Sequence, residues 1–226
     1  MKRIKPSIAL TLAALLVAPA VSLAAGGSSS SVPAAADVPE LTPQQKAINA
    51  YNQGLEYRNK AWKLEEEAAS AEGAKAAKKA AKAQKAYRKA IGQFRMATKH
   101  VANFHQAYSS LGYALRKTGQ YQESLEAYDQ ALAIAPNYPE AIEYRGEAFL
   151  GLDRIEEAKG AYMQLFRIDR ERAAELMTAM RSWLEERRQD AGALSEEEIE
   201  GFATWVEERS DLVAQVGTLA SVDRRW

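Results

Sequence analysis

The sequence contains no cysteine and only two histidines among its 226 residues. The lack of cysteine excludes disulfides, thiolate metal sites, cysteine nucleophiles and a cysteine-linked lipid anchor. Two histidines are too few for a three-histidine zinc centre. The 30 basic and 30 acidic residues cancel, so no net field directs the chain to nucleic acid or to an anionic membrane. We therefore expect no metal, no cofactor and no nucleic-acid partner.

The common catalytic motifs are missing as well. The chain has no Gly-x-Ser-x-Gly elbow, no phosphate-binding glycine loop and no His-Glu-x-x-His helix. His100 and His105 have no obvious acidic partner with which to bind a metal. Glutamate-rich helices can place two carboxylates together for glycan hydrolysis, but glutamate is ordinary on a solvated helix face. We expect a non-catalytic protein and keep a glycan hydrolase as the least favoured alternative.

Residues 1–24 have the features of a secretory signal peptide. A basic start at residues 2–5 precedes an apolar run over residues 8–18 and a Ser-Leu-Ala ending. The run is shorter than the about 20 residues that span a bilayer. We expect cleavage before Ala25 and a mature chain without a transmembrane segment. Export of a cysteine-free protein fits a bacterial periplasm.

The remainder reads as a linker followed by an all-α region. Residues 25–41 are rich in Gly, Ser, Ala and Pro, which predicts a flexible linker. Thr42 begins a Thr-Pro-Gln-Gln sequence that is typical of a capping box with proline in the first turn. From there on, Gly and Pro are few and the apolar spacing is helical. We predict helices only.

Two stretches repeat with a period of 34 residues. The first has Tyr108-x-x-Leu-Gly-x-x-Leu, then Gly-x-Tyr, then a Ser-x-x-x-Tyr-x-x-Ala helix ending at Pro136. This pattern resembles the tetratricopeptide repeat (TPR) family over residues 105–138. The second unit, residues 139–172, is similar but has Arg145 in place of leucine. The resemblance implies a short solenoid of helix pairs that binds a protein or peptide segment on its concave surface.

Residues 42–104 read as a divergent first unit, a long helical hairpin. Gly54 and Ala90 are 36 residues apart, whereas Gly112 and Ser124, their equivalents, are 12 apart. Each helix of the hairpin should therefore be about 12 residues longer than usual and project roughly 18 Å farther. Apolar residues repeat at spacings of three and four on both halves, and the phase breaks at Gly73. We expect Gly73 to end the first helix in a left-handed conformation.

The second half of the hairpin is strongly basic. Residues 73–99 contain nine Lys or Arg and no acid, which suggests a binder of anionic envelope polymers. In a hairpin closed at Gly73, however, the glutamates at 65–67 lie opposite Lys78, Lys79 and Lys82. We favour such cross-helix ion pairs and keep polymer binding as the main alternative function.

Residues 173–226 are predicted to form capping helices and a mobile tail. Ser195-Glu-Glu-Glu begins the second helix with a capping-box pattern. Trp205 is interpreted as core rather than as a contact residue. The apolar stripes consist of Ala173, Leu176, Met177, Met180, Trp183 and Leu184, then Ile199, Phe202, Val206, Val213 and Val216.

The family resemblance implies that a partner lies against the first helix of each pair. We expect the contact residues among those that the packing seams do not use, which are Tyr51, Leu55, Arg58, Gln106, Ser109, Tyr113, Arg116, Glu140, Glu143 and Glu147. Tyr113, Arg116, Glu143 and Glu147 carry opposite charges on adjacent units, an arrangement that orients a ligand. We expect their replacement to leave stability almost unchanged. The Lys/Asn/Arg clamp by which some relatives hold a terminal carboxylate is not reproduced.

Overall fold

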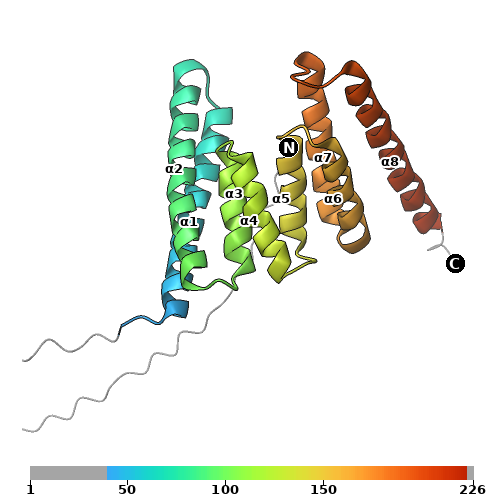
Figure 1. The fold of residues 1–226 in the computed structure, drawn as a ribbon. Helices are drawn as coiled ribbons and strands as arrows, with labels where there is room; N and C mark the ends of the chain where they lie inside the picture. The colour runs from blue at the N-terminus through green and yellow to red at the C-terminus, as the bar shows by residue number, and fades with distance from the viewer. Residues whose placement is uncertain (1–39, 223–226) are drawn as a thin grey trace, which may run out of the picture. The chain divides into compact units, whose positions relative to one another are not determined.

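A computed structural model describes the backbone of residues 40–222 and the side chains of residues 40–212. The predicted signal peptide, most of the linker and the tail after residue 222 lie outside the described residues. Within them the predicted all-α class is confirmed (Figure 1). The helices are α1 (Pro43–Ala69), α2 (Gly73–His100), α3 (His105–Lys117), α4 (Tyr121–Ile134), α5 (Pro139–Leu150), α6 (Ile155–Ile168), α7 (Arg170–Gln189) and α8 (Glu196–Val222). None of these helices is long and apolar enough to cross a membrane.

The helices pack in sequential pairs, as the 34-residue repeat predicted. The pairs are α1–α2, α3–α4 and α5–α6, and each second helix also contacts the first helix of the next pair. α7 packs against both α5 and α6, and α8 packs against α7. Consecutive odd-numbered helices also contact one another: α1 with α3, α3 with α5, and α5 with α7. These four helices therefore share one side of the described region, which we call the odd-helix face.

Side-chain caps set the starts of several helices. Thr42 accepts a hydrogen bond from the Gln45 N–H, and the Gln45 side chain accepts one from the Thr42 N–H, so the predicted capping box is confirmed. Ser195 and Glu198 make the same reciprocal bonds at the start of α8. Asp169 caps α7 by accepting from the N–H of Arg172.

The hairpin is long, with 27 residues in α1 and 28 in α2 against 13 in α3 and 14 in α4. Glu65 of α1 and Gln84 of α2 both contact Lys117, the last residue of α3. The hairpin between them therefore extends beyond the end of α3, as Figure 1 shows. Gly73 has the expected positive φ of 53°, but the prediction that it ends α1 is wrong. It begins α2, because Ser70 already caps α1 by donating its N–H and its hydroxyl to the Glu66 carbonyl.

Glycine allows the paired helices to approach closely. A Cβ added at Gly112 of α3 would lie 2.6 Å from the ring of Tyr128 in α4, and one added at Gly54 of α1 would collide with Phe94 in α2. At Gly146 the nearest atom is 2.6 Å away and belongs to Leu176 of α7. Real Cβ atoms do not come this close to neighbours, so a side chain at any of these positions would force its neighbour to shift. The shift is hardest at Gly54 and Gly112, where the neighbour is a fully buried aromatic ring.

The turns inside the two repeats use one left-handed residue each, at equivalent positions 34 residues apart. Gly119 has φ 77° in the first repeat, and Asp153 has φ 57° in the second. A non-glycine residue is uncommon in this conformation. The Asp153 carboxylate pairs with Arg187 of α7 at 2.7 Å, which ties the turn to the capping region.

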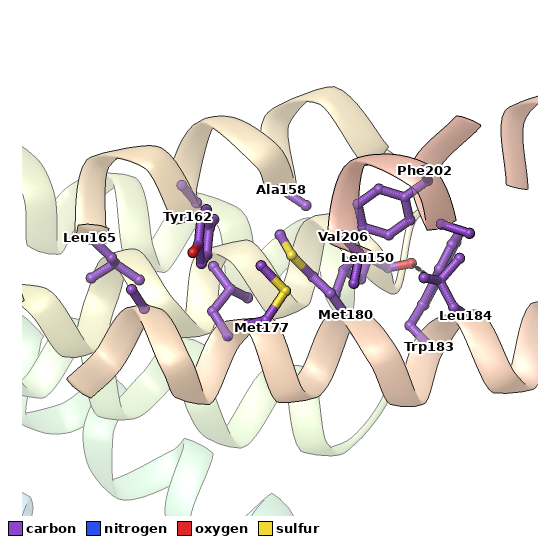
Figure 2. Close-up of a cluster of buried hydrophobic side chains, with 14 of the residues drawn as sticks. Leu150, Ala158, Tyr162, Leu165, Met177, Met180, Trp183, Leu184, Phe202 and Val206 are labelled. Atoms are coloured by element: carbon purple, nitrogen blue, oxygen red, sulfur yellow. Dashed lines mark hydrogen bonds between the residues drawn. The ribbon is translucent and has the colours of Figure 1, made fainter. Parts of the chain in front are cut away.

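The capping region has the largest cluster of buried side chains (Figure 2). All six apolar residues predicted for α7 are buried, as are Ile199, Phe202 and Val206 of α8; Val213 and Val216 fall outside the described side chains. Trp183 is buried and donates its indole N–H to the Leu150 carbonyl at 2.7 Å. Trp205 is half-buried and lies edge-on to Tyr162, so its interpretation as a packing residue is confirmed.

Candidate binding surface

The predicted contact residues all lie on α1, α3 or α5, the first helices of the pairs. Their side chains are less available than the sequence suggested. Ser109, Tyr113 and Glu143 are buried, with 4%, 9% and 5% of their surface exposed. The prediction that Tyr113 and Glu143 lie outside the packing is therefore wrong. The residues that keep partial exposure are Tyr51, Leu55, Arg58, Gln106, Arg116, Glu140 and Glu147.

Tyr113 is buried because aromatic side chains from the neighbouring units close over it. The indole N–H of Trp62 in α1 donates to the Tyr113 hydroxyl at 2.6 Å, and the two rings meet edge-on. Tyr144 of α5 packs against the other side, with ring centroids 5.0 Å apart. Tyr113 thus joins α1, α3 and α5. Its main contribution is to packing between the units.

Ion pairs continue this connection along the odd-helix face. Arg116 of α3 pairs with Glu147 of α5 at 2.7 Å and lies above the rings of Tyr113 and Tyr144. Burial acts to lower the pKa of Arg116, but the attraction of the Glu147 carboxylate outweighs it and holds this pKa above its usual range. The opposite charges expected on adjacent units are present, but they neutralise each other rather than face an empty groove.

A second ionic group connects α5 to α7. Arg172 of α7 pairs with Glu143 at 2.6 Å and with Glu140 at 3.4 Å. Burial raises the pKa of Glu143 from 4.5 to about 7, because the effect of desolvation outweighs the hydrogen bond from Arg172. The negative charges of Glu147 and Glu175 also raise the pKa of Glu143.

This raised pKa predicts a pH-dependent stability. A carboxyl group with a higher pKa in the folded state holds its proton more tightly there, so its contribution is full below pH 4.5 and is lost as pH rises through 7. We expect the free energy of unfolding to fall over this window by on the order of 1–3 kcal/mol because of Glu143. In urea unfolding at pH 5 and pH 8, Glu143→Gln should remove that component. Glu126→Gln, on the exposed side of α4, is the matched control; a wild-type pH response in Glu143→Gln would refute the assignment.

Arg58 of α1 differs from Arg116 and Arg172, which pair with carboxylates of α5. Its guanidinium lies 4.3 Å above the ring of Trp62, and its only hydrogen bond within the described residues is from Nη2 to the amide oxygen of Asn59 at 3.2 Å. Partial burial lowers the pKa of Arg58, and the nearby groups that oppose this effect are tyrosines rather than carboxylates.

Sequence reasoning missed three residues that shape this face. Trp62, Tyr144 and Arg172 supply the contacts to Tyr113 and Glu143. Trp62 was detectable, because it follows Arg58 by four residues and so shares its side of α1. Arg172 was not, because it was assigned to the end of the second repeat, whereas it lies in the first turn of α7.

The lysine-rich hairpin only partly follows the predicted pairing. Lys79 pairs with Glu67, as expected. Glu65 instead pairs with Lys117 of α3 and accepts a hydrogen bond from the Tyr87 hydroxyl. Among residues 40–212, Lys78 and Lys82 form no ion pair and are exposed to solvent.

The two histidines lie at the junction of the first two units. His100 is the last residue of α2, and His105 begins α3 with its ring edge-on to Tyr138. No group of three His, Cys, Asp or Glu residues suited to a metal ion occurs in the part of the chain that the structure describes.

Comparison with known proteins identifies one repeat. Residues 105–138, which contain α3 and α4, match the tetratricopeptide repeat family. A search of curated proteins finds no match. Among solved structures, the chain is similar to "First TPR of Spaghetti (RPAP3) bound to HSP90 peptide SRMEEVD", with 18% identity and a TM-score of 0.47. The alignment covers 62% of this chain and 95% of that one.

Proposed function

We propose that this protein is a non-catalytic periplasmic adaptor that binds a protein or peptide segment along the odd-helix face. The observation that carries the proposal is the arrangement of that face. A tetratricopeptide repeat lies at its centre, and half-buried aromatic, apolar and charged side chains line the helices on either side of it. Surfaces that combine aromatic and arginine side chains with a polar rim are typical of protein-binding sites.

The residues of this face fall into two groups, one that packs between the helix pairs and one that is available to a partner. Tyr113 and Glu143 are buried, and with their half-buried partners they hold neighbouring units together. Tyr51, Leu55, Arg58 and Gln106 retain exposed surface and are the proposed partner contacts. Exchanging the buried residues would disturb the stack itself, so a test of binding must use the second group.

Photo-crosslinking in the native host tests the proposal. A benzophenone amino acid at Gln106 should give a discrete adduct with one partner, because Gln106 is a half-buried residue of α3, one of the odd-numbered helices. The same amino acid at Met163, an exposed residue of α6, should give none. Adducts at Lys82 on the hairpin and none at Gln106 would contradict the proposal.

The periplasmic assignment makes a separate prediction. The basic start, short apolar run and Ser-Leu-Ala ending predict cleavage before Ala25. Sequencing the N-terminus of protein released from the periplasm should therefore give a chain beginning at Ala25. Recovery of the protein in membranes with its basic start intact would instead make it a tethered adaptor.

A second candidate function is binding of an anionic envelope polymer by the hairpin. Polymer binding is favoured because Lys78 and Lys82 are exposed and form no ion pair with any described residue. Such binding would weaken with salt, because it would depend on screened surface charges. The crosslinks at Lys82 and Gln106 distinguish the two candidates.

A further inference from the structure

The charge of the protein is concentrated on two helices, and the two have opposite signs. α2 contains nine basic residues and no acidic one, whereas α8 contains seven acidic residues and one basic one. The other six helices have net charges between −3 and +2. α2 packs against α1 and α3, and α8 packs against α7. The two charged helices therefore lie at opposite ends of the stacked pairs (Figure 1).

Five lysines share one side of α2, which we call the basic side. They are spaced three or four residues apart, and all five are exposed. None of them forms an ion pair within the described residues, where Glu67 of α1 pairs with Lys79 instead. Like charges four residues apart repel each other on a helix, so this row lacks a partner. The basic side consists of Lys75, Lys78, Lys82, Lys85 and Lys89.

Four carboxylates share one side of α8, which we call the acidic side. They are spaced four, seven and four residues apart, which places them along one line of the helix, and all four are exposed. Within the described residues only Glu200 forms an ion pair, with Arg188 at 3.6 Å. The acidic side consists of Glu196, Glu200, Glu207 and Asp211.

The two rows are complementary in length as well as in sign. At 1.5 Å per residue, both extend for about 21–23 Å along their helices. Beyond residues 40–212, the only acidic residues of the sequence are Asp37 and Asp223, which are too few to neutralise five lysines. An anionic polymer would neutralise α2 and leave α8 without a partner. A second copy of the chain would neutralise both.

We propose that copies of this chain associate head to tail, with the basic side of α2 in one copy bound to the acidic side of α8 in the next. Because the contact joins two different surfaces, it can continue into a ring or a filament. Single surface ion pairs are weak, but two facing rows combine several of them and fix the orientation of the copies. Both helices are even-numbered, so the inference goes beyond the proposed function and does not depend on it.

Sedimentation of the protein isolated from its host provides the first test. At about 0.1 M salt, dimers and larger species should form as the protein concentration rises. At about 1 M salt, where the screening length falls from about 10 Å to about 3 Å, the apparent dissociation constant should rise about tenfold or more. A protein that stays monomeric at the lower salt concentration, or whose association does not respond to salt, would overturn the proposal.

Charge reversal identifies the two surfaces. Lys78→Glu/Lys82→Glu and Glu207→Lys/Asp211→Lys should each weaken self-association about tenfold or more, because like charges then face each other. An equimolar mixture of the two variants should associate again, since the reversed basic side of one variant fits the reversed acidic side of the other. This rescue also shows that both variants are folded. A mixture no more associated than its components would refute the contact.

Arg167→Glu/Arg170→Glu is the matched control. Both arginines are exposed and lie on neither charged side, and the variant changes the net charge as much as the lysine variant does. It should associate as wild type does; an equal loss would assign the effect to net charge and contradict the proposal. In the native host, a benzophenone amino acid at Lys82 should crosslink to α8 of a second copy. An adduct with an envelope polymer alone would overturn the proposal in favour of the second candidate function.

Discussion

Gly112→Leu should unfold the repeat stack at much lower urea concentration than wild type. The Cβ alone would lie 2.6 Å from the ring of Tyr128, a fully buried side chain that cannot move into solvent. Overpacking of this kind costs about 1–3 kcal/mol or more. Because each helix pair is stabilised by its neighbours, the loss should spread to the adjacent units. Circular dichroism during urea unfolding measures the effect.

Gly160→Leu is the matched control for this prediction. Gly160 is also inside a helix, α6, but a Cβ there would have no neighbour within 4 Å. Leucine favours the helix over glycine by about 0.5–1 kcal/mol, so the control should keep or slightly raise the midpoint. Equal midpoints for Gly112→Leu and wild type would mean that α3 and α4 do not pack through this glycine.

Trp183→Ala should destabilise the capping helices α7 and α8. Trp183 packs against Phe202 of α8 and donates its indole N–H to the Leu150 carbonyl of α5. Removing a buried tryptophan costs about 3–5 kcal/mol, and the carbonyl loses its partner as well. We expect a lower thermal midpoint and faster hydrogen exchange in α7 and α8 than in α1 and α2.

Trp183→Phe separates the two contributions. Phenylalanine keeps an aromatic ring in the cluster but cannot donate a hydrogen bond to the Leu150 carbonyl. The free energy of unfolding should therefore fall by less than in Trp183→Ala, with about 1–3 kcal/mol of the decrease due to the unpaired carbonyl. If both variants kept nearly the thermal midpoint of the wild type, Trp183 would not be important for the stability of the capping region.

The sequence predicted the elements of this fold well because its signals are local. Thr42 and Ser195 supply caps within three residues of their partners, and Gly112 faces a bulky residue of the next helix. The end of α1 was misplaced because Ser70 caps the helix with bonds to its own last turn. Both Ser70 and Gly73 can end a helix, and residue type alone does not rank them.

The candidate surface was harder to predict because its state depends on other units. The period of the repeat correctly predicts that each candidate contact residue lies on the first helix of its pair. Burial does not, because Tyr113 is covered by Trp62, 51 residues earlier in the chain, and by Tyr144. Glu143 likewise takes its partner Arg172 from α7, 29 residues later in the chain. Long-range contacts of this kind depend on helix tilt, which the spacing of residues leaves open.

Asp153 shows that the two repeats are not interchangeable modules. It occupies the position that Gly119 fills in the preceding unit, and its backbone is held in a conformation that glycine adopts more easily. The aspartate gives α7 an ionic partner in Arg187 that glycine cannot provide. A chain with the two units in reversed order would present Gly119 to the cap and leave Arg187 without that partner. The turn of the second repeat therefore makes one contact with the cap that the turn of the first repeat could not make.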